Sequence, residues 1–206
     1  MESTNGFNRK EMEKEARKRD ILDMAATLFA SRGYHEVKVD EIAEGVGLSK
    51  GTIYLYFENK EKLFFSILFE RLKELNQRLS QAIHREGTFD LRLKGFIGTY
   101  LDFFKENEAI YKIVHSEKTR MSMETHYQFH AHWQQASLDM FALITQLVEE
   151  GAEAGRLRPL PPATMALTLL GILNMVIYDW VYQGTAVREA NDVDLVFDLY
   201  LNGAKK

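Results

Sequence analysis

Apolar residues recur along the chain three or four positions apart, the spacing of an α-helix, and alternation of apolar and polar residues never extends over six positions. Ile21, Ala25 and Leu28 begin the pattern. They predict a first helix over about residues 10–32 that ends at Gly33, since glycine commonly follows the last helical residue. The same spacing continues to the carboxy-terminal residues, so the sequence predicts an all-α fold.

Capping residues mark several of the later helices. Ser49 and Asn59 each precede a helical stretch and carry the short polar side chain that caps a first turn. Gly47 ends the stretch before Ser49. We expect helices over about residues 39–46, 50–57, 60–86, 89–106, 108–115, 118–150, 163–183 and 192–201.

The helices change in length along the chain, and this change predicts two domains. Short helices occupy the first part, whereas long, aromatic-rich helices follow. We place the boundary inside the fourth helix. The predicted parts are a flexible tail over residues 1–9, a three-helix domain over residues 10–60, and a helical domain for ligand binding and dimerisation over residues 61–206.

The segment from Ile42 to Phe57 combines two short helices with a tight turn, which is the arrangement of a helix-turn-helix motif. Ile53 faces inward, and Gly47 permits the turn. The polar positions of the second helix then face outward, as in a helix that enters the major groove of DNA. Gly51 lets the backbone approach a phosphate or base edge, and the N–H groups at the helix start attract phosphate.

The run from Ile42 to Leu63 resembles the DNA-binding signature of TetR-type transcriptional regulators. The resemblance extends back through residues 25–33 and covers roughly the first third of the chain. It implies an all-helical homodimer, usually a repressor, whose variable carboxy-terminal domain binds a small molecule and whose last two helices form the dimer interface. The positions that carry it are Ile42-Ala43, Gly47, Ser49, Gly51-Thr52, Tyr54, Tyr56-Phe57, Lys60 and Leu63.

Carried over by position, the resemblance implies that Tyr54 and Lys60 contact DNA phosphates. This chain has Lys38 where family members often have threonine, so the second helix loses a hydroxyl cap and gains a cation. The alternative is a helix hairpin that does not bind DNA, in which Tyr54 and Tyr56 are half-buried supports. The predicted DNA-binding residues are Lys38, Ser49, Lys50, Gly51, Thr52, Tyr54, Tyr56 and Lys60.

Aromatic residues at helical spacing dominate the carboxy-terminal half. Such a stripe is core in most proteins, yet helices around a cavity use the same residues, and polar groups on the same face favour a pocket. We expect the effector, an unknown small molecule, to contact Tyr100, Phe103, Tyr111, His130, Trp133, Asn174 and Tyr178. His126 and His130 have a spacing at which two imidazoles can share a metal. No acidic residue completes an obvious triad, so we predict neither a metal site nor a cofactor.

The last two predicted helices are strongly apolar, which indicates a four-helix bundle between two subunits. A single helix-turn-helix reads a short half-site. Two recognition helices about 34–36 Å apart would occupy successive major grooves of a near-palindromic operator. The predicted interface residues are Leu173, Ile177, Val193, Val196, Phe197 and Tyr200.

Charge excludes indiscriminate electrostatic binding. The chain holds 26 basic and 30 acidic residues, a net charge of −4, and residues 1–80 are neutral. The run from Arg9 to Asp20 is interpreted as a solvated helix face, with contact of Arg17 or Arg19 to the DNA backbone as the alternative. The absence of cysteine and of a secretory signal fits a cytoplasmic protein. Residues 159–178 are uncharged, but we interpret them as a buried helix rather than a membrane span.

These observations predict a sequence-specific DNA-binding transcriptional regulator, a repressor released from its operator by a small-molecule ligand. The alternative is an architectural or chromosome-organising DNA-binding protein of the same fold without an effector. The sequence contains no nucleophile elbow, phosphate loop, zinc-protease motif or dinucleotide fingerprint, so we predict that the protein is not an enzyme.

Overall fold

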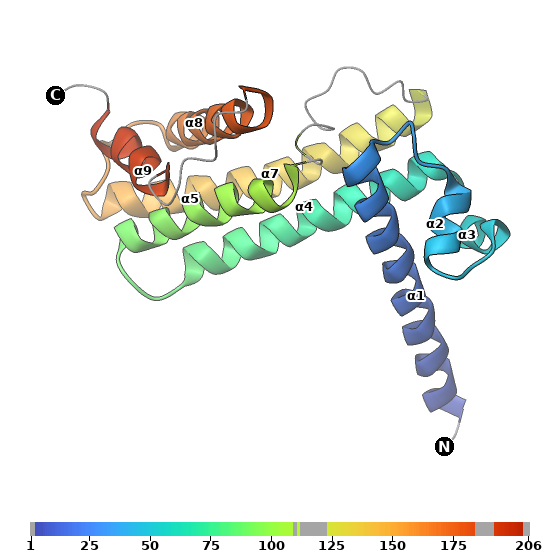
Figure 1. Cartoon of the computed structure of the whole chain (residues 1–206). Helices are drawn as coiled ribbons and strands as arrows, with labels where there is room; N and C mark the ends of the chain where they lie inside the picture. The colour runs from blue at the N-terminus through green and yellow to red at the C-terminus, as the bar shows by residue number, and fades with distance from the viewer. Residues whose placement is uncertain (1–2, 109–110, 112–122, 184–191, 204–206) are drawn as a thin grey trace. The chain divides into compact units, whose positions relative to one another are not determined.

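A computed structural model of the chain describes residues 3–108, 111, 123–183 and 192–203, with the side chains of residues 3–8 and 123–137 outside that description. The described residues form eight helices joined by turns, which confirms the all-α prediction (Figure 1). The helices are α1 (Ser3–Arg32), α2 (Val39–Gly45), α3 (Lys50–Tyr56), α4 (Lys60–His84), α5 (Phe89–Glu106), α7 (Met123–Glu153), α8 (Pro162–Gln183) and α9 (Asp192–Asn202).

The chain divides into two compact units, and the division falls inside α4. Among the described residues, unit 1 contains residues 3–71 and 123–129, and unit 2 contains residues 72–108, 111, 130–183 and 192–203. α4 therefore begins in unit 1 and ends in unit 2.

Unit 1 is built on α1, which packs against α2, and α2 packs against α3. Burial in α1 begins at Ile21, and the side chains of residues 9–20 are exposed apart from a half-buried Lys18. α1 begins at Ser3, so the predicted tail over residues 1–9 is helical from there on. Strong helix formers follow over residues 10–18, and an ion pair one turn apart joins Arg9 to Glu13 at 2.9 Å.

The turn between α2 and α3 follows the predicted pattern. Gly47 has a φ of +65°, a left-handed conformation that glycine adopts without the clash of a β-carbon. At the start of α3 the Ser49 hydroxyl accepts a hydrogen bond from the Thr52 backbone N–H at 3.1 Å. Asn59 caps α4 in the same way through the Lys62 N–H at 2.8 Å. Both predicted caps are confirmed.

Unit 2 holds a hydrophobic core to which α5, α8 and α9 contribute, and these three helices pack against one another. An aromatic series runs through α5, with ring centroids of Phe96 and Tyr100 6.3 Å apart and those of Tyr100 and Phe104 5.1 Å apart. At the edge of the core, Lys94 of α5 donates to Asp194 of α9 at 2.6 Å. Its ammonium also lies 4.7 Å from the ring centroid of Phe197, so α9 is held against α5 by polar and aromatic contacts.

α8 differs from its prediction as a buried helix. Four of its residues are buried: Ala166, Leu169, Leu173 and Ile177. The rest of the helix leaves large apolar side chains exposed, Leu167 and Met175 among them. By length and composition α8 is the one helix of the described residues that is apolar enough to cross a membrane, and 22% of its most apolar window is buried. A helix that is apolar on every side needs a second partner besides the core of its own chain.

Candidate DNA-binding surface and effector region

The helix-turn-helix of unit 1 anchors α3 by one face and exposes the other. Ile53 and Phe57 are buried, whereas Lys50, Gly51 and Tyr54 are exposed, as predicted. Thr52, also predicted to face outward, is half-buried beside Ile53, and so is Tyr56. A side chain three positions after buried Ile53 lies near the same face of the helix, which explains the difference.

Leu55 is a residue that the sequence analysis did not single out. Its side chain is 83% exposed, the most exposed large apolar side chain among the described residues. Each residue of an α-helix turns the side-chain direction by about 100°. Leu55, two positions after the buried Ile53, therefore points to nearly the opposite side of α3. Counting two positions from Ile53, which was predicted to face inward, identifies Leu55 as an outward-facing residue from the sequence alone.

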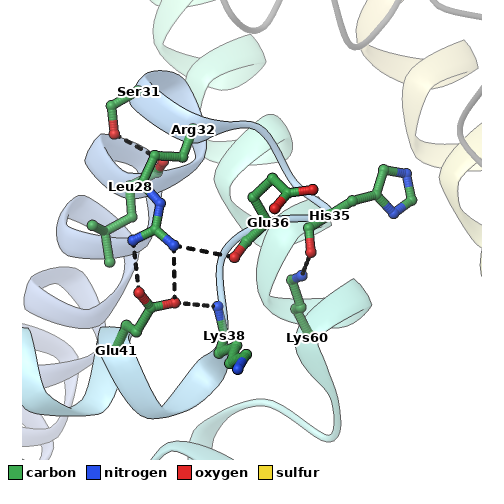
Figure 2. A network of polar contacts seen from close by, with 8 residues as sticks. All are labelled: Leu28, Ser31, Arg32, His35, Glu36, Lys38, Glu41 and Lys60. Atoms are coloured by element: carbon green, nitrogen blue, oxygen red, sulfur yellow. Dashed lines mark hydrogen bonds and ion pairs between the residues drawn. The ribbon is translucent and has the colours of Figure 1, made fainter.

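Two of the predicted DNA-binding lysines make contacts within unit 1. The Lys50 ammonium donates to Asp40 Oδ2 at 2.7 Å, and this hydrogen bond raises the pKa of Lys50 and lowers that of Asp40. The Lys60 ammonium lies 4.3 Å from the ring centroid of Tyr34 and donates to the His35 carbonyl at 3.5 Å (Figure 2). Burial lowers the pKa of Lys60. Both ammoniums are thus engaged within unit 1 before any phosphate binds, and Asp40 partly neutralises the charge of Lys50.

Asp40→Asn is therefore expected to tighten operator binding at low salt and to make it more dependent on salt. The change frees the Lys50 ammonium, and each additional phosphate contact steepens the plot of log affinity against log salt by about 0.9. Exposed ion pairs add little to stability, so the melting temperature stays nearly constant. Fluorescence anisotropy with a labelled operator at several salt concentrations measures the slope. Asp20→Asn, which removes the same charge from an exposed position of α1, is the control; weaker binding by Asp40→Asn would contradict the expectation.

The cap missing at Lys38 is supplied by Glu41. Its Oε2 accepts the Lys38 backbone N–H at 2.7 Å, and its Oε1 accepts Arg32 Nη1 at 2.6 Å (Figure 2). These hydrogen bonds lower the pKa of Glu41, with the one from Arg32 contributing most. Arg32 Nη2 also donates to the Glu36 carbonyl at 3.2 Å. The end of α1, the connecting loop and the start of α2 are thus joined by one guanidinium, and the exposed side chain of Lys38 is not needed for the cap.

In unit 2, three of the predicted effector residues form a polar cluster inside the aromatic core. The Tyr111 hydroxyl donates to the Asn174 carbonyl at 2.9 Å, and the Tyr100 hydroxyl donates to the Asn174 side-chain oxygen at 3.4 Å. Burial raises the pKa of both tyrosines. Tyr100 and Tyr111 are almost completely buried, and Asn174 is half-buried. This tyrosine–asparagine cluster, defined by these three residues, joins α5 and α8 to Tyr111.

The remaining effector candidates are dispersed. Phe103 is fully buried in the core, with its ring 5.3 Å from that of Phe104. Tyr178 is exposed and packs against Tyr182 at 4.9 Å between ring centroids. The side chains of His126, His130 and Trp133 lie outside the described residues.

The structure places four of the six residues predicted for a dimer interface inside a single chain. Leu173, Ile177 and Val196 are fully buried inside one chain and Tyr200 is nearly so, while Val193 and Phe197 are half-buried. A fully buried side chain has no surface left to bury against a second chain. The apolar surface of α8 and α9 consists of other residues: Leu167, Met175, Tyr178, Tyr182, Leu195 and Leu199.

An open groove of about 620 Å³ lies on this surface. Ile172, Met175 and Val176 of α8 and Leu195 of α9 contribute to its walls. Gly171 lies in it, and a β-carbon there would meet no atom within 4 Å. The groove is thus a concave, mainly apolar surface on the outside of unit 2, with Asp179 and Asp192 also in its lining.

Two family models match the chain. The model described as "Bacterial regulatory proteins, tetR family" matches residues 21–67, and the model described as "Tetracyclin repressor-like, C-terminal domain" matches residues 86–203. The first covers α2 and α3 with the adjoining ends of α1 and α4. The second covers the core of unit 2 and includes α8.

Among curated proteins, the chain is similar to the HTH-type transcriptional regulator YhgD of Bacillus subtilis, with 28% identity over 81% of this chain and 85% of the relative. It is 25% identical to the HTH-type transcriptional repressor Rv1474c of Mycobacterium tuberculosis, over 93% and 94% of the two chains.

Solved structures share the fold. FadR of Bacillus subtilis in complex with stearoyl-CoA superposes with a TM-score of 0.75 at 21% identity, covering 91% of this chain and 99% of that one. AibR in complex with isovaleryl coenzyme A and operator DNA superposes with a TM-score of 0.67 at 20% identity, covering 90% and 98%.

Proposed function

Because the chain belongs to the TetR family of bacterial regulatory proteins, we propose that it is a homodimeric repressor released from a near-palindromic operator by a coenzyme A thioester. The family consists of DNA-binding transcriptional regulators, so the chain is a regulator of transcription and not an enzyme. We place it in the cytoplasm, where a bacterial chromosome is accessible to it.

The tyrosine–asparagine cluster is the observation that carries the effector proposal. An apolar, largely aromatic lining with a few convergent polar groups is typical of small-molecule sites. Here Tyr100, Tyr111 and Asn174 provide the polar groups inside the core of unit 2. FadR and AibR bind stearoyl-CoA and isovaleryl-CoA, two thioesters that differ in the acyl group. An acyl group supplies the apolar surface that this core accepts, and its carbonyl supplies a hydrogen-bond acceptor.

An effector bound between α5 and α8 has a direct route to α4. Arg78 of α4 donates to Glu106, the last residue of α5, at 2.9 Å, and also to Glu74. A ligand that favours a second packing of α5 shifts this ion pair and with it α4. Since α4 begins immediately after the helix-turn-helix, the shift changes the presentation of α3 to DNA.

In the DNA complex, α3 enters the major groove with its exposed face. Gly51 allows close approach of the backbone, and Leu55 provides an apolar contact of the kind that recognises a thymine methyl group. Ser49 and Thr52 already share a hydrogen bond at 2.9 Å, which orients their hydroxyls at the start of α3. Binding thus depends on shape and base contacts more than on bulk charge.

We place the dimer interface on the exposed apolar surface of α8 and α9. The groove around Gly171 and Met175 gives a helix of a second copy room to approach. A second copy also supplies the second recognition helix that a palindromic operator requires. This assignment explains why α8 is apolar on faces that its own chain leaves exposed.

Acyl-CoA is expected to weaken operator binding by at least about tenfold, within the usual range of coupling between two sites. The probe is a labelled duplex selected from a random library by the wild-type protein, titrated in the presence of acetyl-, isovaleryl- or stearoyl-CoA. Free coenzyme A and free stearate are the ligand controls. Asn174→Ala should reduce the response while leaving effector-free binding unchanged. An operator affinity that no thioester alters would reject the effector and favour a DNA-binding protein without one.

A further inference from the structure

The exposed amino-terminal half of α1 carries basic residues on one side. At 3.6 residues per turn, four of them fall within an arc of roughly 100° around the helix. This basic stripe consists of Lys10, Lys14, Arg17 and Lys18. The acidic residues of the same segment all lie outside the arc: Glu11, Glu13, Glu15 and Asp20.

The basic stripe lies on the side of α1 that carries the helix-turn-helix. Ile21 and Ala25 continue the same arc and are fully buried. Met24, beside the arc, packs so closely against α2 that a methyl group on Gly45 would lie 2.7 Å from its sulfur. Because a helix keeps its faces along its length, the stripe faces the same side as α2. Figure 1 shows that the amino-terminal half of α1 extends beyond α2 and α3.

The structure gives the stripe a surface position. Lys10, Lys14 and Arg17 are exposed, and Lys18 is half-buried. The ion pair between Arg9 and Glu13 joins two residues outside the arc. A helical segment of this length is marginal in water without tertiary packing, so a partner that neutralises the stripe also stabilises the segment.

We propose that the basic stripe binds the phosphate backbone of operator DNA beside the half-site contacted by α3. From Lys10 to Lys18 the helix rises roughly 12 Å, the length of about three to four base pairs. Residues 1–80 have no net charge, so attraction to DNA depends on local groups of this kind. The Lys50 and Lys60 ammoniums have partners within unit 1, which makes the stripe a prominent exposed cationic group of that unit. The proposal rests on DNA binding and not on the effector.

Two matched double variants test the stripe. Lys10→Gln/Lys14→Gln removes two charges inside the arc, and Arg9→Gln/Arg19→Gln removes two on the other side of the same exposed segment. Glutamine keeps a helix propensity close to that of lysine and arginine, and circular dichroism with the melting temperature checks the fold. Operator affinity is measured without effector at several salt concentrations, using the duplex selected by the wild-type protein. Hydroxyl-radical footprinting records the protected sugars.

The stripe variant is expected to lose about tenfold in affinity at low salt, to reduce the salt slope by at least about 1, and to shorten the footprint at both ends. The opposite-face variant should keep the slope and the footprint of the wild type. Equal loss in both variants would show that total charge matters and would overturn the proposal, as would two unchanged footprints. The wild-type measurement is independent of acyl-CoA, so this result and the effector result are separate.

Discussion

Gly51→Ala is expected to raise the melting temperature and at the same time to weaken operator binding by at least about tenfold, or 1.4 kcal/mol. The fold does not require glycine here, because a β-carbon would meet one atom, the Ser49 hydroxyl oxygen, at 3.8 Å. Alanine in a helix is more stable than glycine by up to about 1 kcal/mol. On DNA, the same methyl group would lie where the backbone of α3 must approach a phosphate or base edge. Thermal unfolding and fluorescence anisotropy measure the two effects.

Gly47→Ala is the control for this separation of stability from binding. Gly47 also has open space around it, but its positive φ places any other residue in a strained conformation. We expect it to lower the melting temperature, in contrast to Gly51→Ala. If Gly51→Ala instead bound the operator as tightly as the wild type, α3 would not approach DNA through Gly51, and the predicted orientation of the recognition helix would be wrong.

Local signals explain why the helix boundaries of the amino-terminal unit were predictable. Ser49 and Asn59 cap helices through bonds to residues three positions later, and Gly47 adopts the left-handed turn that its place in the motif indicates. These interactions depend on neighbours in the sequence alone. The start of α1 lies at Ser3 rather than at about residue 10 as predicted, because residues 3–9 carry neither an apolar stripe nor a run of strong helix formers that would mark a helix in the sequence.

Partners distant in the sequence could not be inferred in the same way. Lys50 meets Asp40 from the preceding helix, and Lys60 meets Tyr34 from a loop before that. The cap of α2 depends on Arg32, nine residues before Glu41. Each of these contacts exists only once the helices of unit 1 have packed. A pattern of residue types therefore predicts lysines for DNA contact without showing that Lys50 and Lys60 already contact groups of their own chain.

The faces of α8 illustrate the same difficulty for apolar residues. Leu173 and Met175 are equally plausible interface residues in the sequence, because α8 is apolar all round. Packing against α5 and α9 buries Leu173 and leaves Met175 exposed. Periodicity identifies a helix face only when the opposite face is polar. The distinction between the core of one chain and the apolar surface left exposed therefore came from the structure.

Met175→Asp is expected to convert the dimer into monomers and to reduce operator affinity more than any other single change considered. Met175 is 63% exposed in one chain, so the fold of the monomer tolerates a carboxylate there. In the proposed dimer each subunit would bury an unpaired charge, a change that typically costs about 3–5 kcal/mol and corresponds to at least about a hundredfold weaker association. A monomer presents one recognition helix and contacts half of the operator. Analytical ultracentrifugation and anisotropy measure association and DNA binding on the same preparation.

Met12→Asp provides the matched control, since Met12 is 67% exposed but lies on α1. It should leave the dimer intact while introducing the same charge. Melting temperature and circular dichroism must agree between the two variants at concentrations where both are monomeric. If Met175→Asp stayed dimeric with full operator affinity, the interface would not use the groove around Gly171, and the exposed apolar surface of α8 and α9 would require a different partner.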